Sequence, residues 1–253
     1  MEALEEVVRI LQGQATLAFA VFLRMSAFFT LMPGFGERSV PVRIKLGLGL
    51  AMTMVVLPAV EPTPGLSQPI MLIFTEIATG LILGLGLRLF ILALQTAGSI
   101  AAQATSLSQL LGGNAAEPMP AIGHILVVAG MALAVMTGLH IKAAQFFVLS
   151  YELVPAGQFP RPDFFSEWGV HRIARAFALA FSLAAPFVIL SVIYNLALGA
   201  INRAMPQLMV AFVGAPLITA GGLVLLCLAA PLMLGAWIEA MDQFLAAPLE
   251  GMR

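Results

Sequence analysis

Apolar residues run along this chain in long, nearly continuous stretches that are separated by short clusters of turn-forming residues. Six stretches approach or exceed the roughly 20 residues that a helix needs to cross a hydrocarbon core. They lie near 14–33, 42–60, 70–94, 122–149, 173–198 and 208–238. The apolar residues do not alternate with polar ones, which argues against the strands of a β-barrel. The pattern therefore predicts an all-α, polytopic membrane protein of about six long helices, packed as helical hairpins.

Clusters of Gly and Pro mark the breaks between these stretches. They fall at 33–36, 61–65, 112–120 and 155–162, and Arg203 with Pro206 marks the fifth. Glycine and proline are the residues that most often end helices and open turns. Residues 204–238 carry no charge and are longer than one span requires, so Pro216, Gly221, Gly222 and Pro231 are predicted places for a bend or a change of partner.

Polar, uncharged side chains recur within the segment 95–109. Gln95, Ser99, Gln103 and Ser106 follow one another at offsets of four, four and three, which places them on one face of a helix. This polar stripe fits three environments: a water-filled pathway, a partner chain that buries the amides, or the membrane interface. Because the stripe has no charge, it does not favour an ion-selective pore.

Composition supports a membrane protein without catalytic chemistry. Apolar residues make up 60% of the 253 positions and charged residues only 10%, too few to cover a water-facing surface. A net charge of -1 offers no attraction for nucleic acid. The single cysteine, Cys227, excludes an intrachain disulfide, and the acidic start Met1-Glu2-Ala3-Leu4-Glu5-Glu6 lacks the basic region of a signal peptide. No catalytic or nucleotide motif is present, so we expect no enzyme, no cofactor and no metal site.

A few charges interrupt the apolar stretches: Arg24, Glu76, Arg88, Lys142, Arg175 and Glu239. An ionisable group inside hydrocarbon costs at least ~2.5–3.5 kcal/mol, so each should face protein or water. Arg24 lies nearest the middle of its stretch and most needs a buried carboxylate, for which Glu76 is the candidate. The alternative is a proton or ion relay, but relays use several acids in register and this chain offers one or two.

Small residues at helical spacing indicate close helix packing. Gly80 and Gly84 form a GxxxG pair, and Gly47 with Ala51 forms a second small pair. Small side chains let helix backbones approach where lipid provides no hydrophobic driving force. The spacing leaves open whether these faces pack within the chain or against other subunits.

Three separated segments of the chain carry distinctive motifs. The first is RMSAFFTLMPGFGERSVPVRIK at 24–45. The second is Glu76, Gly80 and Gly84 followed by Ala97-Gly98. The third is Ala185-Pro186 followed by NLALGAINRAMPQLMVAFVGAPL. Together they resemble the FliR family of flagellar and type III secretion export-apparatus membrane proteins, in the family's order, and the resemblance covers roughly residues 10–240. Four positions depart from the residues that the family usually has: Met209, Ala211, Ala215 and Ser106. These departures affect individual side-chain contacts and not membership of the family.

The resemblance implies a structural subunit of the flagellar type III protein export gate. Such a subunit forms with FliP and FliQ, beside FlhB, the channel through which unfolded flagellar proteins are secreted. It would lie in the bacterial inner membrane at the base of the basal body. The chain would form one domain, 1–253, with a FliP-like part over about 1–170 and a FliQ-like hairpin over about 171–253.

The resemblance also implies roles for particular residues. The loop after the Ala97-Gly98 helix, 106–120, would project into the channel as a plug, with a constriction formed by Leu107, Leu110, Leu111, Gly112, Gly113 and Met119. The polar stripe would face the channel or a partner. Expected assembly contacts are Arg24, Gly80, Gly84, Asn195, Gly199, Arg203, Pro206 and Gln207.

Two other functions fit the same composition. One is the equivalent subunit of a non-flagellar injectisome, which differs in its substrates. The other is a six-span transporter of small molecules or ions, which predicts internal repeats with interrupted helices in matching halves. The sequence shows no convincing repeat.

Overall fold

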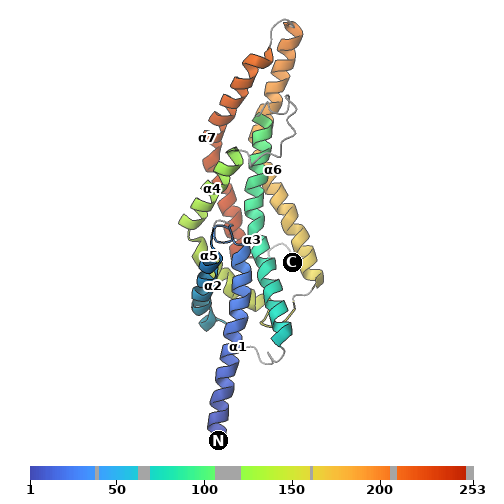
Figure 1. Ribbon diagram of the computed structural model, residues 1–253. Coiled ribbons are helices and arrows are strands. Elements are labelled where there is room, and N and C mark those ends of the chain that lie inside the picture. Colours follow the sequence, from blue (N-terminus) through green and yellow to red (C-terminus); the bar gives the residue numbers. More distant parts are fainter. Residues whose placement is uncertain (38–39, 62–68, 106–120, 160–161, 206–209, 249–253) are drawn as a thin grey trace. The chain divides into compact units, whose positions relative to one another are not determined.

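The computed structural model describes residues 1–37, 40–61, 69–105, 121–159, 162–205 and 210–248, and every regular element among them is a helix (Figure 1). The all-α prediction is therefore confirmed. The elements are α1 (Glu2–Leu31), α2 (Val42–Val56), the short 3-10 helix η1 (Leu57–Ala59), α3 (Pro69–Thr105), α4 (Ala121–Met136), α5 (Leu139–Leu153), α6 (Pro162–Ala204) and α7 (Val210–Ala246).

Five of the described helices are long and apolar enough to cross a membrane, and six spans result if α4 and α5 count as one broken span. This agrees with the polytopic prediction but corrects the fourth stretch, 122–149, which is not one helix. The chain breaks at Thr137 and Gly138, and Gly138 has φ of +82°. Glycine adopts this left-handed conformation without the steric cost that a Cβ imposes.

Two predicted boundaries also need correction. The third stretch does not end at 94, because α3 continues through most of the polar stripe to Thr105 as one helix of 37 residues. The last stretch does not end at 238, because α7 begins at Val210, passes through both Pro216 and Pro231, and continues beyond the charge-free run to Ala246. A helix tolerates proline in such surroundings when neighbouring groups satisfy the freed carbonyls.

The predicted break at 33–36 falls between helices, as do the described residues 155–159 of the break at 155–162. The fifth break is displaced, because α6 includes Arg203 and ends at Ala204. Gly34 and Gly157 have φ of +81° and +76°, so glycine is required at both turns. At Gly36 the chain passes so close to α1 that an added Cβ would lie 2.6 Å from the carbonyl oxygen of Thr30. The predicted breaks at 62–65 and 112–120 lie outside the described residues.

The helices pack into two compact units. Unit 1 comprises Met1–Leu89, Thr137–Arg172 and Met241–Arg253, and unit 2 comprises Phe90–Met136 and Ile173–Ala240. These units reflect packing within the chain. The predicted division near 170 rests on likeness to other subunits, so it stays a prediction.

In unit 1, α1 and the first half of α3 pack through the predicted GxxxG pair. A Cβ on Gly80 would lie 2.3 Å from the carbonyl oxygen of Arg24, and one on Gly84 would lie 2.8 Å from that of Phe28. This pair therefore packs within the chain. Beside it, the buried ring of Phe28 lies 6.0 Å from Phe146 and 5.9 Å from Phe147 of α5, measured between centroids. The rings fill the core around which α1, α3 and α5 meet.

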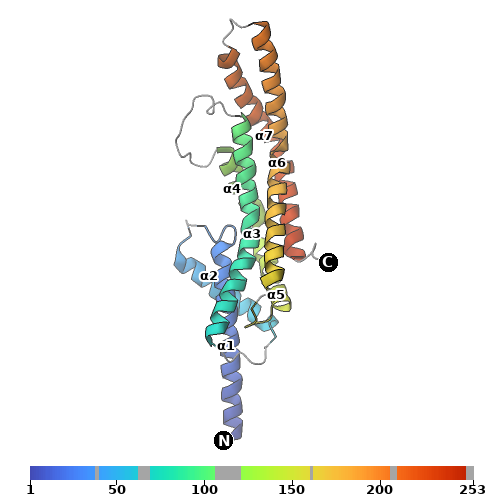
Figure 2. The same cartoon turned by 90° about the vertical axis from the view of Figure 1, so that its right-hand side faces the viewer.

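In unit 2, α3 and α4 cross where two glycines meet: a Cβ on Gly98 would lie only 2.2 Å from the Cα atom of Gly123. Trp237 of α7 donates a hydrogen bond to the carbonyl of Phe90, with 2.8 Å between nitrogen and oxygen, and its side chain is fully buried. Residues 173–204 of α6 and 210–240 of α7 run antiparallel, side by side in both views, as a long hairpin (Figures 1 and 2).

Candidate functional site

The most polar place inside unit 1 is a fully buried cluster around Arg24 and Glu76. Arg24 lies on the face of α1 that contacts α3, and Glu76 lies one turn before Gly80 on α3. Both side chains have 0% exposure, and Arg24 Nε lies 2.7 Å from Glu76 Oε2. A second bond joins Arg24 Nη2 to Glu76 Oε1 at 3.1 Å, which makes the pair bidentate. The predicted pairing of Arg24 with Glu76 is confirmed.

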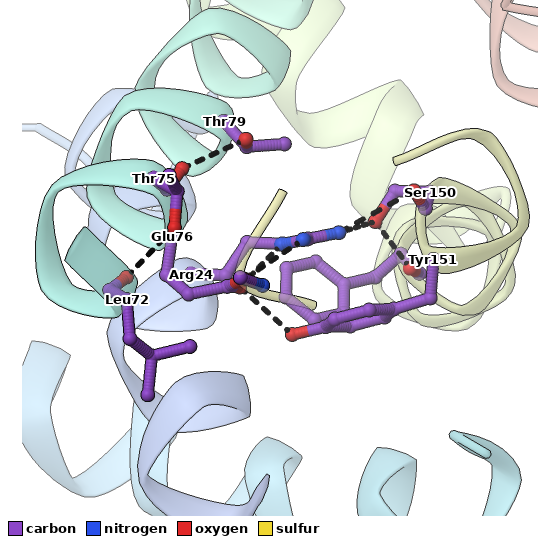
Figure 3. A network of polar contacts seen from close by, with 9 residues as sticks. Arg24, Leu72, Thr75, Glu76, Thr79, Ser150 and Tyr151 are labelled. Carbon is purple, nitrogen blue, oxygen red and sulfur yellow. Dashed lines mark hydrogen bonds and ion pairs between the residues drawn. The ribbon is translucent and has the colours of Figure 1, made fainter. Parts of the chain in front are cut away.

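The remaining groups of the cluster come from α5 and the turn after it (Figure 3). Arg24 Nη1 donates to the carbonyl oxygen of Ser150 at 3.3 Å, and its guanidinium carbon lies 3.8 Å from the ring centroid of Tyr151. The Tyr151 hydroxyl donates to Glu76 Oε2 at 3.4 Å, and the backbone N–H of Gly157 donates to Oε1 at 2.8 Å. A charged pair without water needs this many partners to offset its desolvation.

These contacts favour a structural role for the cluster over a proton relay. Glu76 accepts hydrogen bonds from Arg24, Tyr151 and Gly157, so both of its oxygens are engaged by groups of the same chain. The cluster joins three parts of the chain that lie far apart in the sequence: α1, α3, and α5 with the turn that follows it at Gly157. Tyr151 and Gly157 were not foreseen. A glycine between Pro155 and Pro162 indicates a turn, but not that its N–H reaches a carboxylate.

The other charges within apolar stretches lie nearer the surface. Arg88 pairs with Glu37 at 2.7 Å, with 27% and 30% of the side chains exposed, and Lys142 pairs with Asp242 at 2.7 Å. Arg175 and Glu239 are exposed. No group of three His, Cys, Asp or Glu side chains in the described ranges gathers as a metal site would require.

A second cluster in unit 1 holds the end of α7 and was not foreseen. The carbonyl oxygen of Pro248 accepts a hydrogen bond from Trp168 Nε1 at 3.0 Å and another from Arg172 Nη2. The Arg172 guanidinium carbon also lies 4.5 Å from the ring centroid of Phe244. Trp168 and Arg172 are four residues apart on α6, so the sequence indicated only that they share one face of a helix, and not which group they bind.

The polar stripe lies on α3 in unit 2. Gln95 and Ser99 are half-buried and Gln103 is exposed, while Ser106 lies outside the described residues. Just after Gln103, the end of α3 packs tightly on α7: a Cβ on Gly222 would lie 2.6 Å from Thr105 Cγ2. Thr105, the last described residue before the segment 106–120, thus packs against α7. That segment, with the predicted constriction residues Leu107, Leu110, Leu111, Gly112, Gly113 and Met119, lies outside the described residues.

The expected assembly contacts of the third sequence match fall at the end of the α6–α7 hairpin. Asn195, Gly199 and Arg203 are exposed on α6, and among the described residues nothing beyond the local turn of α6 lies within 4 Å of a Cβ built on Gly199. Pro206 and Gln207 lie outside the described residues. Arg24, Gly80 and Gly84, expected in the same role, are instead buried in contacts within unit 1.

Comparison with known proteins identifies the family. Residues 15–244 match the family of bacterial export proteins, family 1. The chain is 31% identical over 239 residues to the flagellar biosynthetic protein FliR of Caulobacter vibrioides, with 92% of this chain and 95% of that protein covered. It belongs to the FliR family of bacterial export proteins. The FliR of Bacillus subtilis is 30% identical over 206 residues, covering 78% and 79%, and that of Escherichia coli is 29% identical over 229, covering 86% and 85%.

Family membership confirms the resemblance drawn from three sequence segments. The matches cover most of the chain and of each relative, so they concern the whole fold and not a shared module. With its membrane-spanning helices, this FliR-family chain is a membrane component of a flagellar export apparatus.

Proposed function

We propose that this chain is a structural subunit of the flagellar type III export gate in the inner membrane, at the base of the basal body. It forms with FliP and FliQ, beside FlhB, a channel for unfolded flagellar proteins, and its role is structural rather than enzymatic. The observation that carries this proposal is the α6–α7 hairpin, which combines a large uncovered apolar surface with exposed polar residues near its end.

Most of the hairpin is uncovered by the rest of the chain. In the most apolar window of α6 only 22% of residues are buried, and in that of α7 only 28%, against 50% for α3. Large exposed side chains include Phe177, Phe181, Leu196, Val224 and Leu228. Lipid or neighbouring helices can cover such a surface, so these residues alone do not choose between the two.

Polar residues near the hairpin end favour protein neighbours over lipid. Asn195, Asn202 and Arg203 are exposed on α6 among apolar side chains. A cation at the surface of an apolar helix is costly in hydrocarbon, where it finds no acceptor. Gly199 lies between them and leaves open space at which another backbone can approach. Asn195, Gly199 and Arg203 are therefore assigned to contacts with FliP or FliQ.

The channel assignment concerns α3 and the segment after it. Gln95, Ser99 and Gln103 offer uncharged polar groups, which suit a wet wall that passes many different polypeptides. Thr105, which directly precedes residues 106–120 in the sequence, packs against Gly222 of the hairpin. The apolar, glycine-containing sequence of that segment suits a seal that yields to a passing chain. We therefore assign it to the constriction.

Co-purification in mild detergent tests the assembly. The chain, co-expressed with FliP and FliQ, is expected to recover both, and Arg203→Ala is expected to lower the recovered amount. Arg175→Ala is the matched control, because Arg175 is also exposed on α6 but lies far from the hairpin end. Two results contradict the proposal: a folded, monodisperse monomer that recovers neither partner, or a normal yield of complex from Arg203→Ala in cells that no longer export.

A further inference from the structure

The α6–α7 hairpin of unit 2 has an anchored part, 173–187 with 222–240, that packs on neighbouring helices. Trp237 donates a hydrogen bond to a carbonyl of α3, and its ring lies 3.6 Å from a Cβ built on Gly130 of α4. At the other end of the anchored part, a Cβ on Gly222 would lie 2.6 Å from the last described side chain of α3. The anchored part is therefore fixed at both of its ends.

The remaining distal part of the hairpin, 188–204 with 210–221, extends past the end of α3 in both views (Figures 1 and 2). No residue of 188–204 is buried. Gly214 of α7 contacts α6: the Tyr194 hydroxyl donates to its carbonyl, and a Cβ on Gly214 would lie 3.3 Å from Leu198. The two helices of the distal part thus hold each other.

Pro186 of α6 and Gly222 of α7 lie at the same height along the hairpin. The bond between Tyr194 and Gly214 places these two residues side by side. Pro186 lies eight residues before Tyr194, and Gly222 lies eight residues after Gly214. In antiparallel helices both positions are then roughly 12 Å from that bond, at the boundary between the two parts.

Both helices are weakened at this height. Pro186 has no N–H, so the carbonyl of Ser182 lacks the donor that another residue at 186 would supply. Gly221 and Gly222 lack a Cβ, which makes the α7 backbone less costly to bend, and Gly221 faces open space. Proline is also the usual cause of a sharp kink in a helix.

The other prolines of the hairpin do not form such a pair. By the same alignment Pro216 lies opposite Val192, and Pro231 lies opposite Phe177. The opposite helix is unbroken at both places and resists bending there. Within the described parts of α6 and α7, breaks in both helices coincide at the height of Pro186.

We propose that the hairpin has a hinge at Pro186 and Gly222, about which the distal part swings while the anchored part keeps its packing on α3 and α4. The exposed polar end at Asn195 and Arg203 then changes direction without disturbing the core of unit 2. A bend of about 20° moves Ile201, roughly 22 Å beyond Pro186, by about 8 Å. The hinge rests on contacts inside unit 2 and does not depend on the partners proposed above.

Distances between pairs of spin labels test the hinge in single full-length chains in lipid nanodiscs. Labels are attached to cysteines in a Cys227→Ser chain. One pair joins Ile125→Cys on α4 to Ile201→Cys in the distal part, and the other joins Ile125→Cys to Phe177→Cys in the anchored part. All three sites are between 45% and 54% exposed. The spread of distances should be at least ~2-fold larger for the pair that crosses the hinge.

The double variant Pro186→Ala with Gly221→Ala stiffens both helices. Pro186 is exposed and Gly221 meets open space, so neither substitution requires repacking. The variant should reduce the spread across the hinge to about that of the anchored pair, which itself stays unchanged. Gly221→Ala alone should reduce it in part. The matched control is Pro231→Ala, which removes an exposed proline opposite an unbroken helix and should leave both spreads as they were.

Three results would overturn the hinge: equal spreads for both label pairs in the chain without these substitutions, no reduction in either stiffened variant, or an equal reduction in Pro231→Ala. Recovery of FliP and FliQ in a separate co-expression distinguishes the two proposals. Normal recovery with equal spreads rejects only the hinge, and a wide spread across the hinge without recovery rejects only the assembly.

Discussion

Replacing Glu76 by Gln should destabilise the chain more than any other single loss of charge among its described ion pairs. The substitution keeps the size of the side chain but leaves the Arg24 guanidinium buried without a counter-ion. The Gln side chain also has one oxygen in place of the two carboxylate oxygens to which Arg24, Tyr151 and Gly157 donate hydrogen bonds. At least one donor must then face an amide NH2 group and lose its acceptor.

The size of the effect follows from burial. Removing one partner of a fully buried pair costs ~3–5 kcal/mol, because the remaining charge stays desolvated. For a domain of this size that loss lowers the melting temperature by roughly 6–20 °C. Glu37→Gln is the matched control, since Glu37 also pairs with an arginine at 2.7 Å but the side chains are 30% and 27% exposed. That loss is expected to cost about 0–1 kcal/mol, or at most roughly 4 °C.

The assay is the melting midpoint of the purified chain in mild detergent, with its assembled partners where these are needed for recovery. The double variant Arg24→Met with Glu76→Leu removes both charges and is expected to lose less stability than Glu76→Gln, because no buried charge is left unpaired. If Glu76→Gln melts within a few degrees of Glu37→Gln, the cluster is not the stabilising core that its burial and contacts indicate.

Three further results are expected. Gly222→Ala should destabilise the chain, because the added methyl group would clash with Thr105. Its neighbour Gly221 faces open space, so Gly221→Ala should stabilise the helix by up to ~1 kcal/mol through helix propensity. Melting curves of the two variants, recorded in parallel, compare these effects. Gly157→Ala should lower the free energy of unfolding by about 1–2 kcal/mol, because Gly157 has φ of +76°, which a residue with a Cβ adopts at a cost. The melting midpoint measures this loss, and an unchanged midpoint would contradict a left-handed turn. Deleting 112–117 should make cells permeable to a small dye while the complex still assembles, and unchanged permeability would remove 106–120 as the constriction.

Much of this protein could be predicted from local sequence, because its signals are local. Continuous apolar runs require helices, since a chain without water must satisfy its backbone hydrogen bonds within each segment. Glycine and proline clusters at 33–36 and 155–162 end helices for reasons of single-residue geometry. Arg24 needs a buried carboxylate partner because an unpaired charge inside hydrocarbon is costly. Few acidic residues lie within the apolar stretches, so Glu76 could be named as that partner from the sequence.

Other features were decided only by tertiary structure, because they depend on which distant groups meet. The GxxxG pair at Gly80 left its partner open, and the fold supplies the backbone of α1 at Arg24. The N–H of Gly157 donates to Glu76, and the carbonyl of Pro248 accepts from Trp168, only because segments about 80 residues apart come together. Hydrophobic periodicity also failed at Gly138, where an unbroken apolar run conceals a break. The apolar pattern determines that a segment avoids water, whereas the shape of its neighbours decides whether and how it packs within the chain.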